Sequence, residues 1–90
     1  MRIKEGFTLR EIAGEQVIMP TGKNISKFDG AVSLNEVSAF IYNTIDADPG
    51  ISQEELTLKI TDEYEVSAET AEADSSRIVD ELAGYGIVEK

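Results

Sequence analysis

Carboxylates are the side chains of this sequence that could do acid–base chemistry, and many of them come in pairs. Such chemistry needs two carboxyl groups in different surroundings, one of them desolvated, so that their pKa values separate. The expected helices carry four pairs: Glu54-Glu55, Asp62-Glu63, Glu69 with Glu72, and Asp80-Glu81. Each pair falls on an outer helix face without a flanking apolar pocket, so we interpret these residues as solvated surface rather than as a catalytic dyad.

Other residue types that carry catalysis or bind metals are scarce. Histidine and cysteine are absent, which removes the commonest general base, thiolate nucleophiles, disulfides and the usual zinc ligands. Asp46 and Asp48 come nearest to a metal site, but the other oxygen ligands of a calcium loop are missing around them. The sequence also has no glycine-rich phosphate-binding motif. We therefore predict a binding protein rather than an enzyme, with no catalytic residue, metal or cofactor.

The composition is typical of a small globular domain. Of the 90 residues, 41% are hydrophobic and 29% are charged, which argues against wholesale disorder. This length predicts one domain over residues 1–90, with no room for a deep catalytic cavity. Residues 1–7 contain no long apolar run, so we expect neither a signal peptide nor a transmembrane helix. A cytoplasmic location is the simplest expectation.

The charge balance is strongly acidic. With 18 acidic and 8 basic residues the net charge is −10, and a field of that sign repels phosphate backbones and anionic membrane surfaces. We therefore expect neither nucleic acid nor membrane as a partner. Two interpretations of the charge stay open, a solvated coat or an attraction for basic partner surfaces.

Three strands are predicted in the first third of the chain. Residues 7–13 and 15–20 have the pattern of a hairpin about Gly14. Phe28, Ala31, Val32 and Leu34 then fit a third strand over residues 28–34, with Gly30 leaving room for a close backbone neighbour. Three such strands joined by short loops make an antiparallel meander.

Three helices follow, each with a capping residue before it. The helical spacing predicts a first helix over residues 36–46 capped by Asn35. Ser52 and Glu55 form a capping box that opens a second helix, which runs to about Tyr64. Ser67 caps a third helix over residues 68–83, whose buried stripe is predicted to be Ala71, Ser75, Ile78, Val79 and Leu82. Gly84 and Gly86 allow a left-handed exit into a short extended piece, Ile87-Val88.

Strands followed by helices indicate an α+β fold. The short second and third helices, joined by Glu65-Val66, resemble a helix-turn-helix. The third strand runs straight into the first helix with no linker. A strand so placed often lies at a sheet edge, where its backbone donors and acceptors are open to a partner.

The chain also resembles a known family, PqqD, whose members are small peptide-binding proteins of pyrroloquinoline quinone and related peptide-modification pathways. The resemblance rests on residues 1–15, on Leu34-Asn35-Glu36-Val37-Ser38-Ala39-Phe40-Ile41-Tyr42, on Tyr64-Glu65-Val66-Ser67, and on Asp74, Ile78, Leu82 and Gly86-Ile87-Val88. It covers nearly the whole chain. Ile78 departs from the pattern, because the family often has an aromatic residue there, but this is a tolerable core exchange.

The resemblance implies a winged helix-turn-helix fold and a groove between the third strand and the third helix. In the family, the leader segment of a ribosomally made precursor peptide docks there as an added strand, for delivery to a separate maturation enzyme of the radical-SAM type. The peptide-binding residues expected on this basis are Asp29, Gly30, Ala31, Val32, Ser33, Leu34, Ala71, Asp74, Ser75, Ile78 and Leu82.

Alternatives accompany several of these residues. Asp74 is interpreted either as a rim residue paired with Arg77 or solvent, or as an anchor for a donor on the peptide. Ile78 and Leu82 fit core packing better than direct peptide contact. A helix-turn-helix also invites a DNA-binding interpretation, but the third helix carries one basic residue, Arg77, against five acidic ones. A winged-helix transcription factor or a small protein–protein adaptor is therefore the alternative function.

Overall fold

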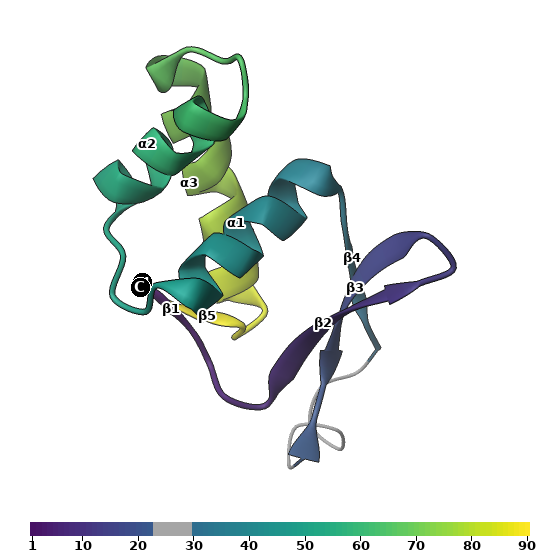
Figure 1. Cartoon of the computed structure of the whole chain (residues 1–90). Coiled ribbons are helices and arrows are strands. Elements are labelled where there is room, and N and C mark those ends of the chain that lie inside the picture. The colour runs from purple at the N-terminus through teal and green to yellow at the C-terminus, as the bar shows by residue number, and fades with distance from the viewer. Residues whose placement is uncertain (23–29) are drawn as a thin grey trace.

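A three-stranded antiparallel sheet precedes three helices in the chain (Figure 1). The computed structural model describes residues 1–22 and 30–90. The elements are β1 (Arg2–Ile3), β2 (Phe7–Ile12), β3 (Glu15–Pro20), β4 (Val32–Leu34), α1 (Glu36–Ala47), α2 (Gln53–Glu63), α3 (Ala68–Gly84) and β5 (Val88–Glu89). This is the α+β arrangement predicted from the sequence, a meander followed by three helices.

The predicted hairpin about Gly14 is formed by β2 and β3. Their register runs from Ile12 opposite Glu15 to Phe7 opposite Pro20, which leaves a two-residue turn. Both turn residues are left-handed, Ala13 with φ 53° and Gly14 with φ 83°. Two positive φ values define the type I′ turn, whose twist matches that of the flanking strands.

β4 is shorter than the predicted third strand. It begins at Val32 instead of residue 28, and it pairs antiparallel with β3; Phe28 and Asp29 lie outside the described residues. Gly30 has a φ of 95°, which extended backbone does not adopt. A Cβ on Gly30 would meet nothing within 4 Å. Glycine is therefore suited to this position because of its positive φ. The prediction that Gly30 makes room for a close backbone neighbour is wrong.

The helix caps are those predicted from the sequence. The Asn35 side chain accepts a hydrogen bond from the Ser38 amide at 2.8 Å, and the Ser67 hydroxyl accepts one from the Thr70 amide at 3.1 Å. At Ser52 both bonds of the capping box form, because Ser52 also donates its amide to Glu55. Each cap satisfies a backbone amide that has no partner within its helix, which fixes where the helix begins.

The core lies between the helices and the inner face of the sheet. The stripe predicted for the third helix is buried in full, and so are Ile51, Leu56 and Ile60, whereas Tyr64 is only half-buried. The buried cluster comprises Ile18, Ile41, Tyr42, Ile45, Ile51, Leu56, Ile60, Ala71, Ile78, Val79, Leu82, Ile87 and Val88. Among the described residues, no helix is long and apolar enough to cross a membrane.

A small second sheet joins the two ends of the chain. Arg2 lies opposite Glu89 and Ile3 opposite Val88, and the side chains of Arg2 and Glu89 form an ion pair. β1 was not predicted from the sequence, and the C-terminal strand begins at Val88, one residue later than predicted. Gly86 has the predicted left-handed φ, at 80°. Gly84, in contrast, is the last residue of α3 and shows no positive φ, so its predicted role is wrong.

Candidate functional site

β4 is an edge strand, as its position before α1 predicted. In the sheet order β2-β3-β4 it has β3 on one side and no further described strand on the other. Val32 lies opposite the fully buried Ile18, so the side chains of Val32 and Leu34 are on the sheet face that packs on the core. Both are half-buried, whereas Ser33 is exposed. The edge therefore combines open backbone with two partly accessible apolar side chains.

The register determines which backbone groups of β4 are open. Residues that flank a two-residue turn exchange both backbone hydrogen bonds, and such pairs alternate along an antiparallel ladder. Counting from Ile12 and Glu15, Val17 directs its backbone groups toward β2, while Gln16 and Ile18 direct theirs toward β4. Their partners Leu34 and Val32 are thereby bonded to β3. The N–H and C=O of Ser33 point to the open edge.

Gly30 and Ala31, which were expected on this strand, take no part in it. Gly30 and Ala31 are exposed and precede β4, and Asp29 lies outside the described residues. Of the six positions expected on the strand, the structure places Val32, Ser33 and Leu34 at the edge. The sequence pattern could not show that the backbone at Gly30 leaves the extended conformation, so that the strand begins only at Val32.

Most of the residues expected on α3 belong to the core. Ala71, Ser75, Ile78 and Leu82 are each at most 4% exposed. They are part of the packed core between the helices, so they offer little surface to a ligand. For Ile78 and Leu82 this agrees with the core interpretation.

Ser75 also makes polar contacts that its sequence position did not indicate. Gln53 of α2 donates to the Ser75 hydroxyl at 2.7 Å, and Ser75 donates to the Glu72 carbonyl at 3.2 Å. Gln53 also reaches the Thr57 hydroxyl at 3.3 Å. These bonds satisfy a buried hydroxyl and join α2 to α3, which is a structural role. A glutamine and a serine 22 positions apart gave no sequence signal of it.

Asp74 is the one expected α3 residue that is exposed. Arg77 forms its ion pair with Glu81 at 3.6 Å, and no ion pair joins Asp74 to another described residue. Pairing with Arg77 is therefore not what the structure shows. Glu72 lines a hollow with residues of α2, and Asp74 is about 200° further around the helix. Asp74 thus lies on the flank of α3 that is turned away from α2, together with Glu81 and Tyr85.

The electrostatics of α3 disfavour contact with nucleic acid. Its six charged side chains are all exposed: Glu69, Glu72, Asp74, Arg77, Asp80 and Glu81. The single basic side chain among them is paired with Glu81. Five carboxylates on the helix that would enter a DNA groove repel phosphate.

Two tyrosines have raised pKa values, and one of them, Tyr64, lines a hollow together with Leu34 of β4. Burial raises the pKa of Tyr42 in the core to about 12, and it also raises the pKa of Tyr64. The ring of Tyr64 packs edge-on against Phe40, with centroids 5.4 Å apart. Within the described ranges, no group of three or more His, Cys, Asp or Glu side chains could hold a metal ion. The chemistry that the β4 edge can do is therefore hydrogen bonding and apolar contact.

Fold and site together define a class of small α+β binding domains. In this class a sheet with an open edge strand precedes three helices in the chain. Residues 15–88 match the family of the coenzyme PQQ synthesis protein D (PqqD). Since this match covers most of the chain, the chain belongs to the PqqD family, as the resemblance indicated.

A solved structure shares the fold. It is described as "TbiB1 in Complex with the TbiA(beta) Leader Peptide", is 24% identical, and superposes with a TM-score of 0.77 over 99% of this chain and 95% of that chain. At this identity the likeness shows the fold alone, and it confirms the predicted architecture. The comparison with curated protein sequences finds no match.

Proposed function

We propose that this protein binds the leader segment of a ribosomally made precursor peptide as an added strand on β4. The observation that carries the proposal is the open edge of β4, with the backbone of Ser33 directed outward. Membership of the PqqD family supports it. So does the leader peptide in the TbiB1 complex, a protein with the same fold.

The edge geometry defines how such a peptide is held. In an antiparallel arrangement one leader residue exchanges both backbone hydrogen bonds with Ser33, and this pairing is tolerant of sequence. The leader residues beside Val32 and Leu34 place their side chains on the core side of the sheet. Two apolar leader side chains at positions i and i+2 complement those half-buried residues. Asp74, exposed on the flank of α3 that is turned away from α2, anchors a donor of the peptide.

In this proposal the chain does no chemistry and delivers the leader to a separate modifying enzyme. The absence of histidine and cysteine supports a binding role. The family resemblance suggests a radical-SAM enzyme as the partner and the cytoplasm as the location.

Chemical-shift mapping with a candidate leader peptide tests the proposal. We expect the amides of residues 31–34 and of the Asp74 flank of α3 to shift on titration into isotope-labelled protein. Genes adjacent to this one supply the candidate precursors. Shifts confined to α2 or to the β2–β3 turn would overturn docking on β4, and no shifts with any of these precursors would overturn the proposed function.

A further inference from the structure

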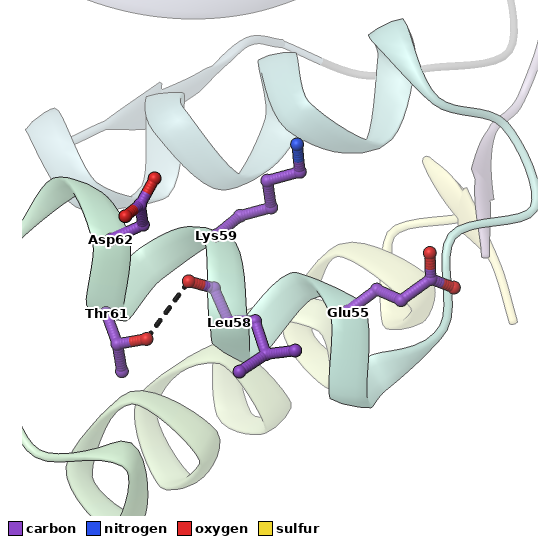
Figure 2. Close-up of a pocket in the computed structure, with 5 residues that line it drawn as sticks. All are labelled: Glu55, Leu58, Lys59, Thr61 and Asp62. Carbon is purple, nitrogen blue, oxygen red and sulfur yellow. Dashed lines mark hydrogen bonds between the residues drawn. The ribbon is translucent and has the colours of Figure 1, made fainter.

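Leu58 is an unusual apolar residue on the outer face of α2. It is 62% exposed, the most exposed of the large hydrophobic residues in the described chain. Its neighbours one turn away on the helix are Glu54, Glu55, Thr61 and Asp62. Figure 2 shows the Leu58 side chain projecting from α2 without covering by another drawn side chain. An aliphatic side chain is thus ringed by three carboxylates.

The surface on both sides of Leu58 is hollowed. One hollow is lined by Glu55, Leu58, Lys59, Thr61 and Asp62 (Figure 2). The other is lined by Gln53, Glu54, Thr57, Leu58, Ala68 and Glu72, where α2 meets the start of α3. Leu58 belongs to both and forms a ridge between them. An apolar ridge flanked by two hollows is a shape that a partner surface can enclose.

The charges around this ridge are uncompensated. Glu54, Asp62 and Glu72 are exposed and form no ion pair with another described residue. Glu55 accepts the Ser52 amide, and Lys59 is the one basic residue among those that line the two hollows. Open carboxylates of this kind attract a basic surface and repel an acidic one.

We propose that this Leu58 surface docks a partner protein that offers an apolar socket rimmed by Lys and Arg. The socket takes Leu58, and the rim pairs with Glu54, Asp62 and Glu72. A second copy of this chain is a poor fit, because a symmetric contact through this face would bring its acidic residues together with Lys59 as the one basic residue on each side.

The location of this surface allows two partners at once. In Figure 1 α2 and β4 lie at different ends of the molecule, and α1 contacts both elements. A peptide added to β4 therefore leaves Leu58 accessible. If the leader is bound as proposed above, on which this step rests, the partner on α2 is the protein that receives the leader.

A synthetic cationic helix provides the test of this recognition chemistry. The probe is an amphipathic peptide of about 16 residues whose apolar face has two rows of leucine with alanine between them, so that Leu58 can insert between the rows, and whose borders are Lys and Arg. Titrated into the isotope-labelled full chain, it should shift the amides of residues 54–62 and 68–72. Leu58→Glu should weaken its binding at least about tenfold, whereas the control Ile12→Glu, at the exposed hydrophobic Ile12 of β2, should leave it unchanged.

The outcomes separate this inference from the proposed function. Leader binding should be unchanged in Leu58→Glu, and a version of the probe with Glu in place of Lys and Arg should not bind. Equal affinity of the probe for the wild type and Leu58→Glu, or shifts away from α2, would overturn docking at Leu58 whatever the leader does. A leader that fails to bind while the probe still requires Leu58 would overturn the proposed function alone.

Discussion

At the scale of single residues, Ser33 is the residue on which the proposed peptide binding depends most. Its neighbours Val32 and Leu34 direct their backbone groups to β3, so Ser33 alone within β4 has both groups available at the edge. The side chain of Ser33 has no assigned role. Backbone and side-chain substitutions at this position therefore have different expected effects.

Ser33→Pro should reduce leader affinity at least about tenfold, because proline deletes the donated hydrogen bond and clashes in a paired strand. The control Ser33→Ala retains the backbone and should bind normally. Titration calorimetry on both variants, with circular dichroism to verify the fold, measures this difference. Val32→Pro should instead destabilise the protein, since the Val32 amide belongs to the β3–β4 ladder. A folded Ser33→Pro variant with normal affinity would exclude docking on β4.

Asp74→Ala should weaken leader binding about tenfold, the effect of removing one partner of a charge-assisted hydrogen bond. Its melting temperature should hardly change, because Asp74 is exposed and forms no ion pair with another described residue. Glu69→Ala, at another exposed acidic position of α3, is the matched control and should bind as the wild type does. A stable Asp74→Ala variant with unchanged affinity would remove Asp74 from the site.

At the scale of elements, the helices could be predicted from the sequence almost to the residue. Each begins at a side-chain cap, Asn35, Ser52 or Ser67, and caps are local features. The buried stripe of α3 followed from its periodicity in the same way.

Other features depend on contacts that local patterns do not encode. β1 and β5 are two-residue strands that pair across 87 positions of the chain, and two residues are too few to show an alternating pattern. The outward direction of the Ser33 backbone depends on the register of three strands. The burial of Ala71 and Ser75, expected on the peptide site, depends on how α3 packs against the other helices.

The β1–β5 sheet should make stability depend on pH. A hydrogen bond and an ion pair with Arg2 hold the pKa of Glu89 below its ordinary value. A carboxyl whose pKa is lowered by folding stabilises the protein above its unfolded pKa, and this contribution is lost as the pH falls through the folded value. Glu89→Gln should therefore flatten the loss of stability between about pH 5 and about pH 3. Both side chains are more than a third exposed, so the effect is small.

Chemical denaturation across this pH range measures the effect. The control is Glu11→Gln, which removes an exposed carboxylate that has no ion pair with another described residue. An identical acid slope in the wild type and Glu89→Gln would show that the Arg2–Glu89 pair does not stabilise the folded protein.

At the scale of the whole molecule, the net charge of −10 means that repulsion between like charges outweighs attraction within ion pairs. The ion pairs between described residues are Arg2–Glu89, Arg77–Glu81 and Lys90–Asp80, and all three are exposed. Exposed pairs stabilise little. Repulsion among the remaining carboxylates opposes the compact state.

Raising NaCl from about 20 mM to about 500 mM should therefore increase the melting temperature by a few degrees, because salt screens this repulsion. Thermal unfolding followed by circular dichroism measures the change. The double variant Glu11→Gln, Glu15→Gln, with two charges fewer, should show a smaller increase. A melting temperature that falls with salt would mean that the three ion pairs outweigh the repulsion.

Amide hydrogen exchange on β4 tests strand addition most directly. In the free protein the Ser33 amide should exchange fast, while the amides of Val32 and Leu34 exchange slowly because they are bonded to β3. A saturating leader peptide should slow exchange at Ser33 and change its two neighbours little. Fast exchange at Ser33 in the presence of bound leader would contradict strand addition on β4.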